Sequence, residues 1–211
     1  MKRVINLDNW NRKEHFKFFS ALDDPFWGIT TTVDFTSIYQ QSKNMEVSFF
    51  LYSVHFLLKC INATTAFKLR IENGEVVEYD KINISPTIGR EDGTFGFGFF
   101  EYDTDLSLFI ENAEKEIHRV KNSAGLSFSK DTARADVIRY SALPWFAFSE
   151  MKHAGSIQTG DSIPKISIGK LIQEKKKLLL PISISVHHGL VDGRNVAEFI
   201  QNVKDGQNNT L

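Results

Sequence analysis

One stretch near the C-terminal end, residues 182–199, limits what the rest of the chain can fold into. Apolar and serine side chains alternate from Ile182 to Val186, which predicts a β-strand with one buried face. After Gly193, apolar side chains recur at helical spacing. The chain must therefore pass directly from a strand into a helix. Such a turn at the end of a sheet holds side chains rigidly, and functional sites are often built there.

The turn carries three residues with useful chemistry, His187, His188 and Asp192. One interpretation is a capped helix start with two incidental histidines. A second is a metal site, which lacks ligands because the chain has one cysteine, Cys60, and no other His, Asp or Glu cluster with ligand spacing. A third is a general base, since histidine titrates near neutral pH and a nearby carboxylate organises the turn. Spacing alone leaves all three open.

The order His187-His188-Gly-Leu-Val-Asp192-Gly193 resembles the His-His-x-x-x-Asp-Gly motif of the CoA-dependent acyltransferases. That group includes chloramphenicol acetyltransferase, the dihydrolipoyl acyltransferase catalytic domains and the condensation domains of peptide synthetases. The motif does not choose among them, but residues 10–199 are similar to the chloramphenicol acetyltransferase family. The resemblance implies that His188 is the general base, that His187 supports it without reacting, and that no metal is needed.

The resemblance extends to the N-terminal segment, whose order Trp-x-Arg-Lys-Glu-His-Phe is similar to the opening of the family. In the family, this arginine pairs with the motif aspartate, so the resemblance implies that Arg12 pairs with Asp192. The physical chemistry agrees, because a buried carboxylate is tolerated only when paired and the fork-shaped guanidinium pairs best. A helix is expected over residues 10–19, with Asp8 or Asn9 as its cap.

Two more segments complete the machinery that the resemblance implies. Ser141-Ala-Leu-Pro-Trp145 is similar to the family segment whose serine donates to the oxyanion of the tetrahedral intermediate. Ser167 stands where the family has a threonine that orients a water near the transition state. Lys170 and Trp145 fall at positions near acetyl-CoA, where a lysine suits the phosphates and a tryptophan suits the pantetheine arm. Without the resemblance, Ser141 would be interpreted as a strand-end serine bonded to backbone.

The acceptor pocket departs from the family. Phe19 stands where the family has a tyrosine that bonds the antibiotic, and Trp27 belongs to a Pro-Phe-Trp turn in place of a Cys-Gly-Phe-like one. A Thr-Phe pair is kept, which implies that Phe95 walls the pocket, but Phe97 stands where a small residue is usual. These four phenylalanine and tryptophan residues are the candidate substrate-binding residues. Loss of one hydroxyl donor typically costs about 1 kcal/mol, so acyl transfer is better supported than chloramphenicol as the acceptor.

The whole chain, residues 1–211, is expected to form one chloramphenicol acetyltransferase-like domain, because its length and its 42% hydrophobic residues suit one large core. Helical patterns at 36–44, 46–63 and 105–121 mix with short strand patterns, several of them in hairpins. This mixture predicts an α/β two-layer sandwich with a mixed, mostly antiparallel sheet packed against helices, the CoA-dependent acyltransferase fold. Residues 205–211 are polar and are expected to be a frayed tail.

The favoured function is an acetyl-CoA-dependent O-acetyltransferase, with chloramphenicol as the first candidate acceptor and antibiotic resistance as the corresponding role. The alternatives are an acetyltransferase of another xenobiotic or metabolite and a trimeric protein that sequesters an aromatic ligand without turnover. Members of the family are homotrimers with each site between subunits, so a homotrimer is expected.

The composition also limits the partners and the cellular location that can be expected for this chain. The net charge of −1 without a basic block argues against a nucleic-acid partner, and residues 46–63 are too short and too interrupted to span a membrane. The absence of a signal-peptide pattern and the single cysteine predict a cytoplasmic protein. His118 and His153 are expected at the surface. Cys60 lies in an apolar segment, which argues against an acyl-cysteine mechanism.

Overall fold

The computed structural model describes residues 1–155 and 160–208, and its centre is a seven-stranded sheet. Its strand order is β2-β10-β8-β7-β5-β6, with β9 paired to β10 off this path. The parallel pairs are β5–β7 and β7–β8, and the other pairs are antiparallel. The prediction of a mixed, mostly antiparallel sheet is confirmed. The strands are β2 Phe26–Asp34, β5 Asn83–Gly89, β6 Phe95–Phe97, β7 Val137–Ala142, β8 Lys165–Ile168, β9 Ile172–Glu174 and β10 Lys177–His187.

A second, three-stranded sheet has the order β1-β4-β3, formed by Lys2–Val4, Glu75–Tyr79 and Leu69–Glu72. The strands β3 and β4 are joined through Asn73 and Gly74, both with positive φ (52° and 82°). Asparagine followed by glycine tolerates this left-handed backbone best, which is why the pair predicts a hairpin. The strand β1, Lys2–Val4, lies at the edge of this small sheet and pairs with β4.

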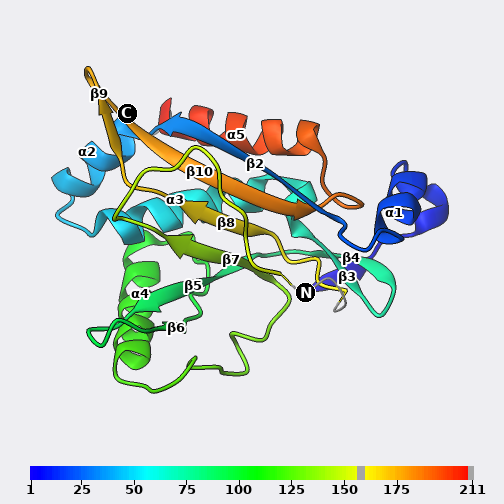
Figure 1. The fold of residues 1–211 in the computed structure, drawn as a ribbon, viewed down its shortest axis with the longest axis horizontal. Coiled ribbons are helices and arrows are strands. Elements are labelled where there is room, and N and C mark those ends of the chain that lie inside the picture. The colour runs from blue at the N-terminus through cyan, green and yellow to red at the C-terminus, as the bar shows by residue number, and fades with distance from the viewer. Residues whose placement is uncertain (156–159, 209–211) are drawn as a thin grey trace.

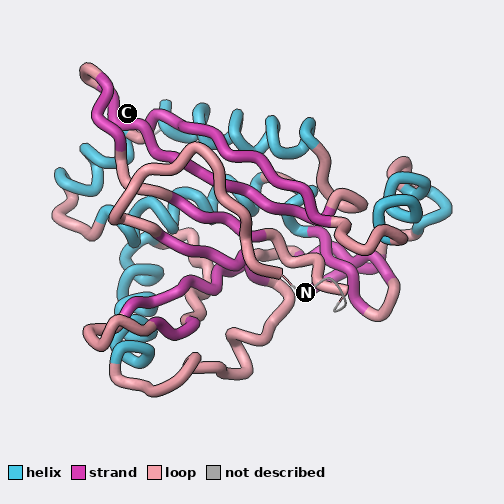
Figure 2. Tube along the Cα trace, in the orientation of Figure 1, coloured by secondary structure: helices cyan, strands magenta, loops and turns pink. Residues whose placement is uncertain are grey.

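Helices cover one face of the large sheet, and Figures 1 and 2 show them as one layer behind the strands. Strand residues such as Ile182 and Ile184 are fully buried in the core between the two layers. The helix α3 is apolar nearly all round and contributes more buried side chains than its neighbours, as expected for a central core helix. The helices of this layer are α2 Thr36–Asn44, α3 Phe49–Ala63, α4 Leu106–Lys121 and α5 Gly193–Asn208.

The opposite face of the large sheet carries a row of hydroxyl groups from neighbouring strands. Ser183 of β10 is in register with Thr30 of β2 and with Ser167 of β8, and Ser167 is in register with Ser141 of β7. Thr87 of β5 ends the row and donates from Oγ1 to Ser141 Oγ at 3.3 Å. The connection from β7 to β8 crosses this face in Figure 1. Residues 156–159 of this connection lie outside the described residues.

Two expectations about helix ends are wrong. The helix α1 begins at Lys13, with Arg12 at the cap position and no side-chain cap, while Asp8 and Asn9 belong to a 3-10 turn capped by Asn6. At the other end, α5 continues to Asn208, so residues 205–208 of the expected tail are helical, while residues 209–211 lie outside the described residues. Polar composition suggested fraying from 205 on, but Gln207 is buried. A second 3-10 turn, Thr65–Lys68, precedes β3.

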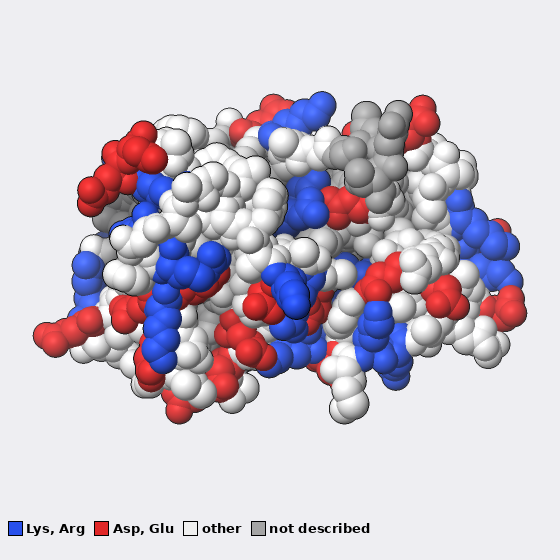
Figure 3. All heavy atoms as spheres, turned by 90° about the horizontal axis from the view of Figure 1, so that it is seen from below, with Lys and Arg blue, Asp and Glu red and all other residues white. Residues whose placement is uncertain are grey.

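No helix within residues 1–155 and 160–208 is both long enough and apolar enough to cross a membrane. Figure 3 shows that basic and acidic side chains are interspersed over the face drawn there. Neither sign of charge dominates that face.

Candidate active site

The strand β10 ends at His187, and backbone hydrogen bonds fix the turn that follows. The amides of Leu190 and Val191 both donate to the carbonyl of His187 at 3.0 Å, and the amide of His188 donates to the carbonyl of Pro25 at 2.8 Å. A Cβ at Gly189 would lie 3.0 Å from the His187 ring, so any larger residue here would crowd that imidazole. The turn therefore holds both imidazoles in fixed places.

His187 has a supporting place in this turn. Its Nδ1 accepts a hydrogen bond from the amide of Gly189 at 3.2 Å, which leaves any ring proton on Nε2. Burial lowers the pKa of His187 to about 4, with a further lowering by His188 and an opposing effect of Asp161. A ring that stays neutral and bonds the turn is a structural part of the site.

Asp192 and Arg12 form an ion pair that ties the N-terminal segment to this turn. Arg12 also donates from Nη2 to the carbonyl of His188 at 3.2 Å, so it holds the backbone of the candidate base directly. Burial alone would raise the pKa of Asp192, but the bond from Arg12 and those from the amides of Asn195 and Arg194 outweigh it and lower that pKa. The carboxylate thus binds Arg12 through one oxygen and caps α5 through the other.

The imidazole of His188 contacts two aromatic rings. Phe19 stacks on it with ring centroids 3.9 Å apart and an angle of 16° between the planes. Trp27 lies 5.3 Å away on a tilted plane and is fixed by its Nε1, which donates to the carbonyl of Val191 at 3.0 Å. The Nδ1 atom of His188 is buried without a hydrogen-bond partner among the described residues. Phe19 and Trp27, which were predicted to bind the acceptor, therefore position the candidate base in this chain.

Ser141 and Ser167 form a second group on neighbouring strands. They are paired in register between β7 and β8, and both line a cavity of about 440 Å³, called here the smaller cavity. Phe97 lines it as well and stacks on Phe128 at 5.4 Å. Phe95 is 46% exposed and meets the edge of Phe97, but it is not part of the described lining.

A second cavity, of about 770 Å³, is called here the larger cavity. His187 and Trp27 line it, and it shares Met151, His153 and Lys165 with the smaller cavity. His188 does not line the smaller cavity in the described part of the chain. One chain thus presents the candidate base separately from the candidate oxyanion donor Ser141 and its neighbour Ser167.

The two residues predicted to lie near acetyl-CoA are close together on the surface. Trp145 is 73% exposed just beyond β7, and Lys170 is exposed just beyond β8. The amide of Lys170 donates to the carbonyl of Phe146 at 2.9 Å, which joins the two segments. An exposed indole beside an exposed ammonium fits a ligand with an apolar arm and phosphates.

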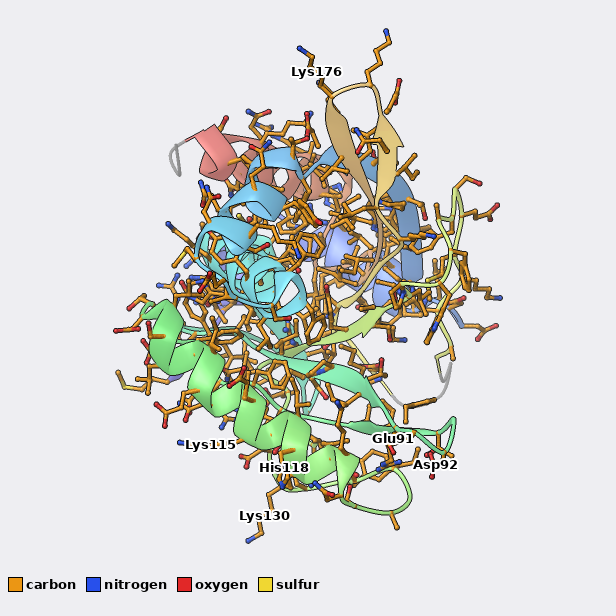
Figure 4. All side chains as sticks on the ribbon, turned by 90° about the vertical axis from the view of Figure 1, so that its left-hand side faces the viewer. Glu91, Asp92, Lys115, His118, Lys130 and Lys176 are labelled. Atoms are coloured by element: carbon orange, nitrogen blue, oxygen red, sulfur yellow. The ribbon has the colours of Figure 1, made fainter. Side chains whose placement is uncertain are left out.

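His153 and Lys165 belong to the site but were missed or misplaced by sequence reasoning. The expectation that His153 lies at the surface is wrong, because it is half-buried and its Nε2 is 3.0 Å from Ser167 Oγ. No periodicity in its loop could have revealed this. Lys165 is 6% exposed, and its place two residues before Ser167 on a strand was a usable signal. His118 is at the surface as expected, on the outer side of α4 in Figure 4.

Among the described residues, no three His, Cys, Asp or Glu side chains are grouped so as to hold a metal ion. Cys60 is buried in α3, and burial raises the pKa of its thiol to about 12. A thiol in that setting is a poor nucleophile.

The fold and the His-His-x-x-x-Asp-Gly turn define a CoA-dependent acyltransferase. The structure of a probable dihydrolipoamide acetyltransferase from Listeria monocytogenes is 13% identical with a TM-score of 0.69 and covers 98% of this chain and 94% of its own, a likeness in fold alone. A chloramphenicol acetyltransferase structure is 29% identical with a TM-score of 0.90 and covers 98% of this chain and 100% of its own.

Sequence comparison narrows this class to one family. The chloramphenicol acetyltransferase family model matches residues 2–204. Chloramphenicol acetyltransferase 3 of Escherichia coli is 27% identical over 208 residues, covering 98% of this chain and 97% of the relative. A chloramphenicol acetyltransferase of Clostridioides difficile is 28% identical over 205 residues, covering 95% and 93%. The chain belongs to the chloramphenicol acetyltransferase family, and it is an acyltransferase.

Proposed function

We propose that the chain transfers the acetyl group of acetyl-CoA directly to a hydroxyl of a small acceptor, with His188 as the general base. The observation that carries this proposal is the setting of His188. Its ring stacks on Phe19 and contacts Trp27, and its carbonyl accepts a hydrogen bond from Arg12, which is paired with Asp192. A base must be fixed in position before its pKa matters, and these contacts restrain both the ring and the backbone of His188.

The proposed reaction is a balanced acyl transfer. His188 takes the proton of the acceptor hydroxyl while that oxygen bonds to the thioester carbonyl carbon. The resulting oxyanion is stabilised by a hydrogen bond from Ser141, with Ser167 orienting a water nearby. The carbon–sulfur bond then breaks, and the departing thiolate receives the proton that the imidazolium holds. Lys170 and Trp145 are proposed to bind the phosphates and the pantetheine arm of CoA.

The proposed assembly is a homotrimer in which His188 of one copy faces Ser141 and Ser167 of the next. Two observations support this arrangement. His188 does not line the cavity that contains Ser141 in the described part of one chain. Family members, as the sequence resemblance implies, build each site between subunits.

Chloramphenicol is the first candidate acceptor because the relatives carry that name. A different xenobiotic or metabolite is the second, and a specific observation favours it. Phe97 fills part of the smaller cavity by stacking on Phe128, and Phe19 is engaged with His188. Two of the aromatic residues predicted to wall a chloramphenicol pocket are therefore engaged with other side chains of this chain. A cytoplasmic location and the absence of a nucleic-acid partner remain predictions.

The test is thiol release from acetyl-CoA with chloramphenicol and with a panel of other alcohols. Turnover with chloramphenicol supports the first acceptor, and turnover with another alcohol supports the second. His188→Ala should lower the rate by about 10²–10⁴-fold while leaving the fold intact. Tight binding of an aromatic ligand without CoA release would instead favour a sequestering protein, and near-normal turnover by His188→Ala would remove His188 from the base role.

A further inference from the structure

Arg90 bonds two separate segments of the chain to each other. It follows β5 at the turn that leads to β6, and Figure 4 shows this hairpin, marked by Glu91 and Asp92, next to the C-terminal end of α4. The Nε atom of Arg90 donates to the carbonyl of Val120, in the last turn of α4, at 2.9 Å. A cation is favoured there, because the carbonyl end of a helix carries a partial negative charge.

The other two nitrogens of the Arg90 guanidinium bond hydroxyl groups. Nη1 donates to Thr94 Oγ1, within the same hairpin, at 3.1 Å. Nη2 donates to Ser123 Oγ at 3.2 Å and to Ser127 Oγ at 2.7 Å, both in the connection that follows α4. Since these acceptors and the Val120 carbonyl are neutral oxygens, the planar fork acts by joining the hairpin to residues 123–128, called here the wall segment.

The hairpin and the wall segment fit closely together. A Cβ at Gly96 would lie 2.5 Å from Arg90 Nη2 and 2.7 Å from Ser127 Oγ, so a larger residue would push the two segments apart. Ser127 is buried and has a φ of 56°, a left-handed conformation that costs free energy in a residue with a side chain. The amide of Phe97 donates to the carbonyl of Leu126 at 2.9 Å. Contacts with the hairpin, including that of Arg90 with Ser127, therefore hold the wall segment in this conformation.

The two joined segments carry the aromatic wall of the smaller cavity. Phe97 belongs to the hairpin, and Phe128 is the last residue of the wall segment. Their rings stack at 5.4 Å with 19° between the planes, and both line the cavity that also contains Ser141. Phe128 is 70% exposed, so its own burial contributes little to holding it in place. The position of this ring therefore depends on the anchoring of the neighbouring Ser127 by Arg90.

We propose that Arg90 is a positioning residue for acceptor recognition, which keeps Phe128 stacked on Phe97 so that an aromatic acceptor meets an ordered wall. Arg90 acts through Phe128, since it lines neither cavity in the described part of the chain. A wall that is ordered before binding spares the ligand the free energy of ordering it. The proposal rests on the proposed function, because the acceptor hydroxyl must react near Ser141, in the same cavity.

The first measurement is hydrogen–deuterium exchange of the full-length protein without any ligand. The amide of Phe97 bonds to the wall segment, so its exchange rate reports whether that segment stays docked. Arg90→Met keeps an unbranched side chain but loses every donor, and it should speed exchange of this amide about tenfold or more. Lys121→Met removes an exposed cation from the same end of α4 and should leave the exchange unchanged.

The second measurement is calorimetry with 4-nitrobenzyl alcohol, a neutral aromatic alcohol, and with CoA as the reference ligand. Arg90→Met should weaken binding of the alcohol about tenfold, because the loosened wall must now be ordered by the ligand. The Kd of CoA should change less than about twofold, since Lys170 and Trp145 lie elsewhere on the chain. Lys121→Met should change neither Kd.

A double-mutant cycle decides whether Arg90 acts through the ring of Phe128. In the Phe128→Ala background, Arg90→Met should change the Kd of the alcohol less than about twofold, whereas a general loss of structure would weaken binding there as well. Ser127→Ala removes only one acceptor of Arg90 and should weaken binding about threefold, which keeps the test available if Arg90→Met does not fold. Circular dichroism and sedimentation check the fold and assembly of each variant.

The outcomes separate this inference from the proposed function. Unchanged exchange at Phe97, an unchanged Kd for the alcohol, equal weakening of CoA binding or a full effect in the Phe128→Ala background would overturn it, as would a wild type that does not bind the alcohol. Acetyl transfer to the alcohol with an unchanged Kd in Arg90→Met would leave the proposed function standing. The expected cycle without acetyl transfer would keep the role of Arg90 in ligand binding and remove the proposed function.

Discussion

Phe19 lies flat on the imidazole of His188, with ring centroids 3.9 Å apart and planes 16° from parallel. The sequence resemblance predicted that Phe19 lies in the acceptor pocket, at a position where the family has a tyrosine. In the structure, its main contact is with the candidate base. A stacked ring restricts rotation of the His188 side chain about its χ1 and χ2 bonds, and it shields one face of the imidazole from water. The residue therefore has a positioning role that the loss of a hydroxyl did not suggest.

Phe19→Ala should lower the turnover number about tenfold, because an aromatic pair contributes about 0.5–1.5 kcal/mol to holding its members together. The KM for acetyl-CoA should hardly change, since Lys170 and Trp145 lie elsewhere. Steady-state kinetics on the best acceptor found measures both quantities. His15→Ala, on the exposed side of the same helix, is the matched control. An effect on KM alone would show that Phe19 binds substrate instead.

The Arg12–Asp192 pair gives a prediction about stability and pH. Asp192→Asn should lower the free energy of unfolding by about 1–2 kcal/mol, less than for a fully buried pair because the aspartate is 34% exposed. The folded-state pKa of Asp192 lies below its ordinary value, so its contribution is present above that value and is lost as pH falls through the folded pKa.

Urea unfolding at several pH values measures this contribution. The difference in unfolding free energy between wild type and Asp192→Asn should be largest near neutral pH and should shrink below the ordinary aspartate pKa of 3.8. Asp205→Asn, on the exposed part of α5, should show no such trend. A difference that stayed constant into strong acid would mean that the carboxylate charge is not what stabilises the turn.

The sequence was most informative where a periodic pattern met a motif. Alternation followed by helical spacing correctly predicted β10, the turn and the start of α5. The ion pair between Arg12 and Asp192, which the resemblance implied, is present in the structure. Their roles in catalysis stay predictions, as do those of Ser141 and Ser167. These features are local or carried by a specific motif, so one sequence suffices to propose them.

The missed features depend on contacts between distant segments. His153 stands in an irregular loop, and only the crossing of that loop over the sheet brings it to Ser167. The end of α5 looked like a frayed tail because its composition is polar, yet Ser37 of α2 donates to Gln207 at 3.2 Å and holds the last turn. Neither contact can be predicted from the spacing of hydrophobic residues, because each depends on the tertiary packing of segments that are distant in the sequence.

Cys60 should not react with thiol reagents in the native protein. It is 4% exposed within α3, and burial raises its pKa to about 12, so almost no thiolate exists at neutral pH. Titration with Ellman's reagent should detect no protein thiol until guanidinium unfolds the chain, when one thiol per chain appears. This also makes the thiol-release assay usable without correction. Rapid labelling of the native protein would show that α3 opens readily.

The proposed shared site can be tested by mixing two inactive variants. His188→Ala lacks the base, and Ser141→Ala lacks the oxyanion donor. If each site takes its histidine from one copy and its serine from the next, every mixed trimer contains one site with both groups intact. Co-expression in equal amounts should then give about a quarter of wild-type activity, because random assembly yields that share of complete sites.

The double variant, with both substitutions in one chain, is the control for this complementation. When it is co-expressed with wild type, the activity should equal the fraction of sites in which both contributing copies are wild type, and no more. If every site lay within a single chain, the two single variants would stay as inactive together as each is alone. Sedimentation of the mixture, showing mixed trimers, would establish that this failure was not caused by a lack of exchange. Restored activity would place His188 opposite Ser141 across a subunit contact.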